Sequence, residues 1–171
     1  AKNYENFELI LDWKTEGEAA MGIRSIPQIA LGGKNSGALT GNMLHDNAAP
    51  KAAANGPQEW NTMQVKVVSD RVTVVLNGVT TAENVILENA CNREIPAYAE
   101  GQILLIAGNA PLNVREMYIR ELPATPRFEL SEEEAADGFE VLFDGTSMHK
   151  WTGNTPNYVP VNGTIYAVSY T

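Results

Sequence analysis

The chain of 171 residues contains one cysteine, Cys91, and has fewer basic than acidic residues. A single cysteine excludes an internal disulfide framework and any metal site built from several cysteines. The formal net charge is −9 and the isoelectric point is near 4.7. Because such a surface would repel nucleic acid and anionic membranes, we expect neither as a partner. Cys91 follows an alanine, and we predict that it is a small buried core residue.

Long apolar runs and familiar catalytic signatures are also missing. No run approaches the roughly 18 apolar residues that a membrane-spanning helix requires, so we expect no membrane insertion. The sequence contains no HExxH, GxSxG, P-loop, Rossmann fingerprint or CxxC pattern. Zinc peptidase, serine hydrolase and nucleotide chemistry therefore lack support. We accordingly expect no bound metal and no cofactor.

Carboxylates that could act as general acids or bases are candidates by residue type alone: Asp12, Glu59, Glu88 and Asp144. Cleavage of a glycosidic bond needs two carboxyl groups set several ångströms apart across a cleft, and sequence alone does not place them. Asp144 precedes a glycine after an apolar run, so a turn-capping role is favoured for it. The sequence thus assigns no catalytic residue.

The chain does contain a long alternation of apolar and polar residues over positions 59–78. Alternation with a period of two places the apolar side chains on one face of a strand. Ser69-Asp70 interrupts the alternation and Asn77-Gly78 ends it, and both pairs suit tight hairpin turns. We predict an antiparallel unit whose buried face carries Met63, Val65, Val67, Val72, Val74 and Leu76.

Further strands are indicated by alternation or by short apolar runs at residues 4–13, 85–87, 101–107 and 114–122. Residues 31–57 are rich in Gly, Asn and Ala, and we expect a long loop there. Together these patterns predict an all-β fold with little helix. The expected architecture is a two-sheet antiparallel jelly-roll sandwich.

The composition changes in the last quarter of the chain. Residues 123–137 contain prolines followed by an acidic run, with Ser131 as a candidate N-cap for a short helix. Residues 138–145 alternate like a strand, and Asn162-Gly163 is a strong hairpin signal.

Several stretches resemble one known family. The segments EWNTM, RVTVVLNGV, ENVILEN and GQILLIAGNAPLNVREMYIREL are similar to those of the 3-keto-disaccharide hydrolase family, and FEVLFDGTSMHKWTGN resembles its opening strand. This family consists of concanavalin A-like jelly-roll domains of carbohydrate-degrading bacteria. The resemblance implies a hydrolase or lyase that acts on glucoside-type disaccharides or their 3-keto forms. It also implies a periplasmic or secreted location.

The resemblance suggests which side chains face the sugar on the family's concave face. Gln28 is retained there, and Arg24, His45 and Arg93 are the other candidate ligand-binding residues. The planar fork of Arg93 can hold a sugar oxygen, or it can pair with a neighbouring glutamate on the rim. His45 precedes an aspartate, and it is either a base with an orienting carboxylate or a solvated loop residue.

Positions on the same expected face depart from the family pattern. Ile26 stands at an acidic position, while Ile106 and Gly108 stand where relatives commonly carry Gln and His. An alkyl group cannot replace a carboxylate in proton transfer. We therefore expect little or no cleavage of 3-keto-glucosides by this chain.

The order of the segments divides the chain into residues 1–122, which form the main part of the sandwich, an acidic linker at 123–137, and the opening-strand motif at 138–171. An isolated hairpin is only marginally stable in water, which favours completion of the same sandwich by the last segment. That completion occurs either within the chain, as in a permuted fold, or by strand exchange in a homodimer. The alternative is that the segment begins a second tandem domain.

The leading functional hypothesis is a carbohydrate-active domain of this family, a glycoside hydrolase that lacks several of the polar residues its relatives carry on the concave face. The alternatives are a non-catalytic carbohydrate-binding module and a structural dimerisation domain. A cleft lined by aromatic and polar groups would favour the first two hypotheses, whereas a filled concave face would favour the third.

Overall fold

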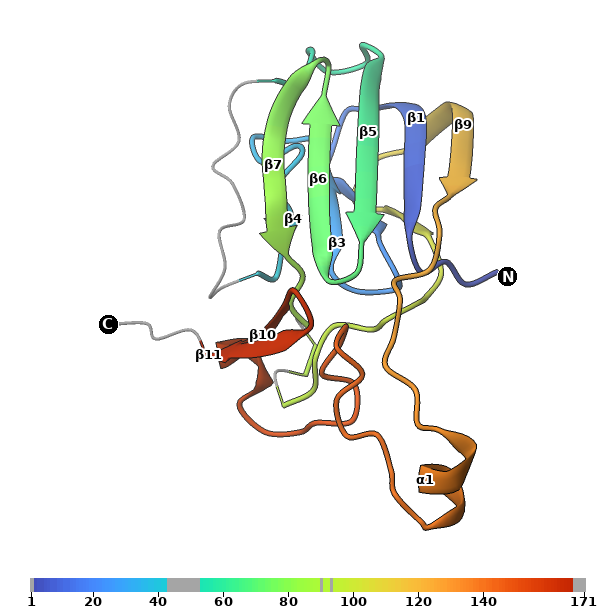
Figure 1. Cartoon of the computed structure of the whole chain (residues 1–171). Coiled ribbons are helices and arrows are strands. Elements are labelled where there is room, and N and C mark those ends of the chain that lie inside the picture. The colour runs from blue at the N-terminus through green and yellow to red at the C-terminus, as the bar shows by residue number, and fades with distance from the viewer. Residues whose placement is uncertain (1, 43–52, 90, 93, 168–171) are drawn as a thin grey trace.

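The computed structural model describes residues 2–42, 53–89, 91–92 and 94–167. Two antiparallel sheets pack face to face, and a short helix and a separate two-stranded sheet lie beyond one end of them (Figure 1). This architecture confirms the predicted sandwich with little helix. In chain order the elements are β1 Phe7–Thr15, β2 Ala19–Gly22, β3 Gln28–Leu31, β4 Leu39–Thr40, β5 Asn61–Val68, β6 Arg71–Leu76, β7 Val79–Ile86, β8 Leu104–Ala107, β9 Leu112–Glu121, α1 Glu132–Ala136, the 3-10 turn η1 Thr155–Asn157, β10 Tyr158–Val161 and β11 Thr164–Ala167.

The chain crosses repeatedly between the two sheets of the sandwich. The five-stranded sheet has the order β7-β6-β5-β1-β9, and the four-stranded sheet has the order β4-β3-β2-β8. In the larger sheet, Leu9 of β1 lies opposite Val65 of β5 on one side and Ile119 of β9 on the other. Segments that are far apart in the sequence are therefore hydrogen-bonded neighbours. Among the described residues, no helix is long and apolar enough to cross a membrane.

The space between the sheets is filled by the apolar half of each alternating strand. The buried face predicted for the central unit is confirmed, because all six of its side chains are at most 1% exposed. Burial of this kind contributes roughly 25 cal/mol for each Å² of apolar surface removed from water. The largest buried partners from other strands are Phe7, Leu9, Leu11 and Trp13 of β1 and Met21, Ile29 and Leu31 of the four-stranded sheet.

The turns of the central unit lie where the sequence predicts them. Ser69, between β5 and β6, has a φ of 53°, and Asn77 and Gly78, between β6 and β7, have φ values of 50° and 81°. The Asn77 side chain also joins the turn to its surroundings, because its Oδ1 accepts from the Thr62 N–H at 2.8 Å and its Nδ2 donates to the Ala53 carbonyl at 2.8 Å. These contacts fix the register of the central hairpins.

One side of the sandwich is formed by the edge strands β8 and β9. Leu105 of β8 lies opposite Met21, and Ile119 of β9 lies opposite Leu9. Both partners are buried, yet Leu105 and Ile119 are exposed. The apolar core thus reaches the surface along this side. Strand exchange in a homodimer would use such an edge, and it stays a prediction.

The C-terminal segment contains the predicted hairpin and the predicted helix cap. β10 and β11 pair on either side of Asn162-Gly163. Ser131 caps α1, since its side chain accepts from the Glu134 N–H while the Glu134 carboxylate accepts from the Ser131 N–H. This reciprocal arrangement is a capping box.

The strand predicted at residues 138–145 is wrong, because the structure assigns no strand there. The backbone carbonyls of this stretch are used locally. Lys150 Nζ donates to the Val141 carbonyl at 2.7 Å, and Trp151 Nε1 donates to the Leu142 carbonyl at 2.8 Å. The sequence does alternate at residues 138–145. However, the side chains of Lys150 and Trp151 bind backbone carbonyls of this stretch that a β-ladder would need.

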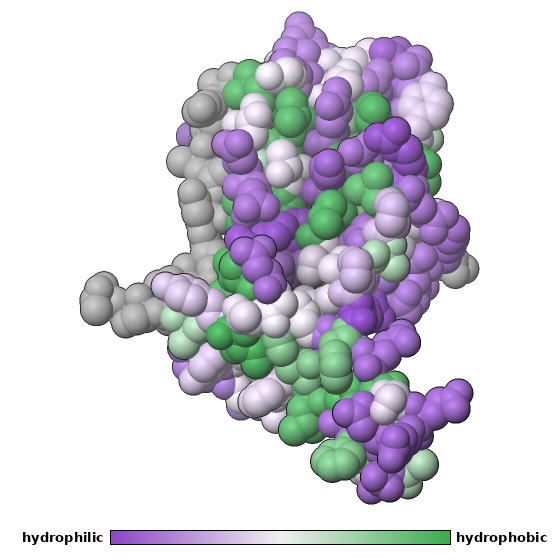
Figure 2. All heavy atoms as spheres, in the orientation of Figure 1, coloured by the Kyte–Doolittle hydropathy of each residue, from purple (hydrophilic) through white to green (hydrophobic). Residues whose placement is uncertain are grey.

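Residues 138–167 contact one end of the sandwich without adding a described strand to either of its sheets. Ser69 Oγ donates to the Thr146 carbonyl at 3.2 Å, and the Gly153 N–H donates to the Glu94 carbonyl at 2.7 Å. Exposed Phe128, Phe139 and Leu142 lie on either side of α1 in the sequence, and Figure 2 shows apolar surface gathered beside α1. The division of the chain at residues 122 and 138 stays a prediction.

Cys91 is exposed, so the prediction of a buried core residue is wrong. The preceding Asn89 is buried instead, and its Oδ1 accepts from the N–H groups of Cys91 at 3.1 Å and Asn92 at 2.9 Å. This Asx-type turn directs Cys91 and Asn92 to the surface.

Arg24 lies in the connection between β2 and β3 and is 2% exposed. Its Nε donates to the Glu5 carbonyl at 2.8 Å, and its Nη1 donates to the carbonyls of Ser69 at 2.5 Å and Tyr98 at 3.3 Å. One guanidinium therefore joins the approach to β1, the β5–β6 turn and the loop before β8. We call this set of contacts the Arg24 clamp.

The Arg24 clamp carries a charge in a desolvated position. Burial lowers the pKa of Arg24 to about 10, while the charges of Glu5 and Asp70 act in the opposite direction. The guanidinium is thus still a cation at neutral pH. Hydrogen bonds to a charged group are stronger than neutral ones, and a buried carbonyl left without its donor costs free energy.

Truncation of Val74 to alanine should lower the free energy of unfolding by about 1 to 3 kcal/mol, because it removes buried methyl groups and leaves a cavity. Val74 is 0% exposed, whereas Val68 at the end of β5 is 40% exposed. Val68→Ala is therefore the matched control and should have little effect. Urea denaturation followed by circular dichroism measures both variants. Equal losses in the two would contradict the assignment of the buried face.

Replacement of Arg24 by methionine should lower the free energy of unfolding by about 3 kcal/mol or more, because several buried carbonyls lose a charged donor. Arg120 is the control, since its side chain is 73% exposed and pairs with Glu8 at the surface; Arg120→Met should leave the unfolding midpoint nearly unchanged. The measurement is again chemical denaturation. An Arg24→Met protein that unfolds like the unmodified chain would show that the clamp is not a structural requirement.

Candidate functional site

The outer face of the four-stranded sheet is the first candidate site. Residues that lie opposite each other in an antiparallel pair share a face, and residues two apart on one strand do so too. The register places Ala20 opposite Ala30 and Ile106, and Gln28 opposite Thr40. These side chains therefore project away from the core on one face of the sheet.

This outer face is hollowed by a cavity of about 680 Å³, which we call the outer-face cavity. Its volume lies within the range of small-molecule sites. The loops that border the sheet contribute two groups of opposite charge, Glu18 and Lys34. The polar lining consists of Glu18, Gln28, Lys34, Asn35 and Thr40, and the apolar lining includes Ala20, Ala30 and Ile106.

The four sequence-predicted site residues have different positions. Gln28 lines the outer-face cavity. Arg24 lies outside this cavity, buried in the clamp. His45 and Arg93 lie outside the described residues. Ligand binding by each of these residues stays a prediction.

The residues that depart from the family pattern also lie in two different places. Ile106 and Gly108 line the outer-face cavity, whereas Ile26 lies in the bend that precedes Pro27 and β3. Packing explains why position 108 is a glycine, because a Cβ built on it would lie 2.2 Å from the Glu18 carbonyl oxygen. A polar side chain at position 108 would displace Glu18, so the glycine supports the wall of the cavity.

Sequence reasoning missed Glu18, Lys34, Asn35 and Thr40. Alternation alone does not reveal them, since their common location depends on which strands pair and in which register. The Glu18 N–H donates to Asn109 Oδ1 at 3.2 Å, and the Thr40 hydroxyl donates to the Gln28 carbonyl at 3.2 Å. Both contacts are long-range in sequence and tie the border of the cavity to the sheet.

Trp60 lies outside the outer-face cavity, and two cations cover its ring. Lys14 Nζ is 4.9 Å and Arg115 Cζ is 4.0 Å from the ring centroid. Such contacts are attractive because the face of an aromatic ring is electronegative. With these side chains over it, the Trp60 ring is occupied by the protein itself and does not offer a free stacking platform.

The carboxylates singled out by type lie outside the outer-face cavity. Asp12 pairs with Arg115 at 3.2 Å, Glu59 accepts from the Gly56 N–H at 3.1 Å, and Glu88 is buried. Asp144 caps a turn, as predicted, because its Oδ1 accepts from the Thr146 N–H and hydroxyl, each at 2.8 Å, and from the Ser147 N–H at 3.1 Å.

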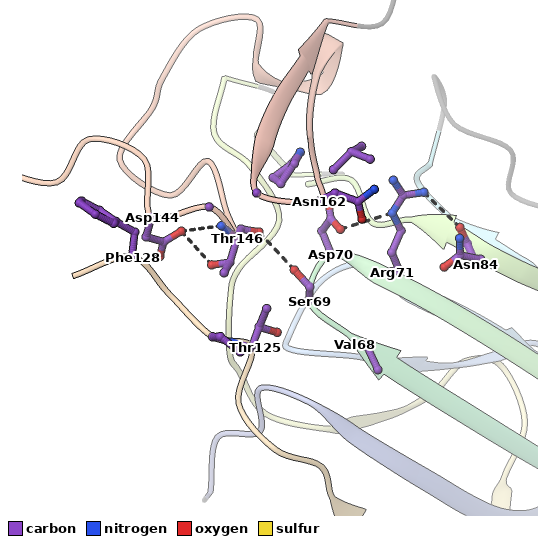
Figure 3. Close-up of a pocket in the computed structure, with 15 residues that line it drawn as sticks. Val68, Ser69, Asp70, Arg71, Asn84, Thr125, Phe128, Asp144, Thr146 and Asn162 are labelled. Atoms are coloured by element: carbon purple, nitrogen blue, oxygen red, sulfur yellow. Dashed lines mark hydrogen bonds and ion pairs between the residues drawn. The ribbon is translucent and has the colours of Figure 1, made fainter.

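A second cavity, of about 710 Å³, lies where the C-terminal segment meets the end of the sandwich, and we call it the junction cavity (Figure 3). Asp70 lines it from the β5–β6 turn, Arg71 from the start of β6, and Asn162 from the β10–β11 turn. Phe128 and Asp144 line it from the connecting segments. No sequence signal pointed to this cavity, because its walls come from turns that are distant in the chain.

The two acidic groups of the junction cavity are perturbed in opposite directions. Burial raises the pKa of Asp70, although the adjacent Arg71 acts to lower it. Burial also acts to raise the pKa of Asp144, but hydrogen bonds from Thr146 and Ser147 hold it below its ordinary value. The Asp144 carboxylate therefore serves to cap its turn, while Asp70 is a desolvated carboxylate beside the Arg71 guanidinium. Within the described part of the chain, no group of three or more His, Cys, Asp or Glu side chains could hold a metal ion.

Solved structures share this fold. A crystal structure from Parabacteroides distasonis titled "putative glycosyl hydrolase" is 24% identical and has a TM-score of 0.55, with 71% of this chain and 80% of that chain covered. Another of the same description and organism is 17% identical and has a TM-score of 0.52, with 72% of this chain and 75% of that chain covered. No curated protein matches the sequence.

The sequence model of one family matches most of the sandwich. The match covers residues 1–120, which include β1 to the end of β9 except for its last residue, and excludes the C-terminal segment. The family is described as the 3-keto-alpha-glucoside-1,2-lyase-like domain. The chain therefore belongs to the family of 3-keto-alpha-glucoside-1,2-lyase-like domains.

Proposed function

We propose that this chain binds a glucoside-type saccharide in the outer-face cavity and that binding, rather than bond cleavage, is what its residues support best. Membership of the family supports a carbohydrate-active domain. The observation that carries the proposal is the outer-face cavity itself, with polar groups on one shared face beside an apolar lining. The family resemblance adds a periplasmic or extracellular location to the proposal.

The polar lining suits a neutral sugar. Each sugar hydroxyl both donates and accepts hydrogen bonds, and the amides of Gln28 and Asn35 and the hydroxyl of Thr40 supply both functions within one cavity. The charges of Glu18 and Lys34 oppose each other, so the border does not select for an ion of one sign. A neutral ligand also avoids the repulsion that the net charge of −9 would impose on an anion.

The apolar lining suits the carbon skeleton of a sugar ring. Ala20 and Ala30 leave room above the sheet, and the larger Ile106 borders them on β8. A ring placed there would bury its C–H groups against these side chains while its hydroxyls reach the polar border. Ligand sites commonly combine a mostly apolar surface with a few placed polar groups.

Cleavage of a glycosidic bond has weaker support in this cavity. A glycosidase uses two carboxyl groups on opposite sides of the scissile bond. Among the described residues that line the outer-face cavity, Glu18 is the one carboxylate. Asp12, Glu59, Glu88 and Asp144 lie elsewhere. A structural domain without a ligand would call for a filled face, and the open cavity favours binding instead.

The proposal predicts saturable binding of maltose in isothermal titration calorimetry. Gln28→Ala should weaken binding about tenfold, because it removes a paired amide donor and acceptor. Gln64 is the matched control, since it is an exposed glutamine on the other sheet, and Gln64→Ala should leave the affinity unchanged. Absence of binding, or equal affinity in both variants, would contradict the proposal.

The same preparation should release no product from a chromogenic 3-keto-glucoside. If the chain did turn over this substrate, and Glu18→Gln abolished the turnover, the binding-only part of the proposal would fail. Glu18 would then be an acid or base for the reaction. The calorimetric and the kinetic outcomes are independent, so binding can be established even where cleavage is observed.

A further inference from the structure

We propose that the junction cavity is a second saccharide site, in which a neutral polyhydroxylated ligand bridges the sandwich and the C-terminal segment. The two cavities share no lining residue. The inference therefore stands on its own geometry and does not require that the outer-face cavity binds sugar.

The junction cavity is built between two tight turns. The β5–β6 turn carries Ser69 with a φ of 53°, and the β10–β11 turn carries Asn162 and Gly163 with φ values of 50° and 78°. Both turns line the cavity, one from the sandwich and one from the C-terminal segment. Tight turns of this kind hold their backbones in narrow conformational ranges, so the two walls are shaped before a ligand arrives.

Hydrogen bonds lock the wall on the sandwich side. The Ser69 N–H donates to Asn6 Oδ1 at 2.8 Å, and Ser69 Oγ donates to the Thr146 carbonyl at 3.2 Å. Thr146 is held in turn by the Asp144 carboxylate (Figure 3). The polar groups of the cavity are thus fixed by contacts behind them, which lowers the ordering cost of binding.

The charged pair of the cavity is internally neutral. Arg71 Nε lies 3.4 Å from Asp70 Oδ1, and Arg71 Nη1 donates to the Asn84 carbonyl at 3.4 Å. The two side chains are 29% and 21% exposed, so both remain accessible from the cavity. A carboxylate accepts and a guanidinium donates, and side by side they match the donor and acceptor of neighbouring sugar hydroxyls.

This pairing selects against ions. A phosphate would gain from Arg71 but would meet the carboxylates of Asp70 and Asp144 in the same cavity. A small cation would meet the guanidinium of Arg71, and the Asp144 carboxylate is already engaged by Thr146, Ser147 and Arg127. A neutral polyol has no such conflict, and the Asn162 amide adds a further donor and acceptor from the opposite turn.

An exposed aromatic ring completes the lining. Phe128 borders the cavity and is 58% exposed. Aromatic rings carry a large apolar surface, and burial of that surface against the C–H face of a sugar ring would add affinity. The volume of about 710 Å³ suits a ligand of disaccharide size.

The test is a titration of the full chain with maltose, followed by ¹H–¹⁵N correlation spectra. Amides of Ser69, Asp70, Asn162 and Gly163 should shift with one saturating curve. Phe128→Ala should weaken that curve about tenfold, and Arg71→Gln should weaken it as well. Phe139→Ala is the matched control, because Phe139 is an exposed phenylalanine on the C-terminal side of α1 and lies outside the cavity lining, and it should change nothing.

The outcomes separate this inference from the proposed function. Shifts at the junction amides that persist in Gln28→Ala support the second site. Maltose shifts confined to the outer-face cavity would overturn the inference and leave the proposed function intact. An unchanged curve in both Phe128→Ala and Arg71→Gln would also overturn it. Inorganic phosphate serves as the ionic probe, and junction shifts with phosphate but not with maltose would contradict a neutral ligand.

Discussion

The Arg24 clamp is the interaction on which both candidate sites depend. Its guanidinium reaches carbonyls of the N-terminal approach, the β5–β6 turn and the loop before β8. The residue itself lies in the β2–β3 connection, shortly before Gln28, the first residue of β3. The carbonyl of Ser69 that it holds belongs to the turn that supplies Asp70. A buried cation, 2% exposed, thus links the outer-face cavity to the junction cavity through the backbone rather than through a ligand.

Period-two patterns in the sequence predicted the layers of the sandwich because they record which face of a strand is buried. The turns at Ser69 and Asn77 and the hairpin at Asn162 follow from residues that tolerate positive φ. The pattern failed at residues 138–145, where Lys150 and Trp151 compete for the backbone carbonyls. Alternation reports a preference of the side chains, and it does not report whether a partner strand is available.

The candidate site was less predictable than the fold. Gln28 could be proposed from the family resemblance, but its neighbours across the cavity come from pairing registers that no local pattern encodes. The burial of Arg24 could not be predicted from the sequence either, because arginine is almost never fully buried unless it is paired. The junction cavity depends on a contact between turns far apart in the chain. Its residues, Asp70 and Asn162, look in the sequence like ordinary turn formers.

We propose that a neutral saccharide occupies the outer-face cavity, and a crystal structure of the chain with bound maltose would locate that ligand. We expect sugar density over β2 and β3, with hydroxyl oxygens within hydrogen-bonding distance of the Gln28 amide and the Thr40 hydroxyl. Sugar density located elsewhere, with Gln28 and Thr40 in contact with solvent alone, would show that this face is not the saccharide site.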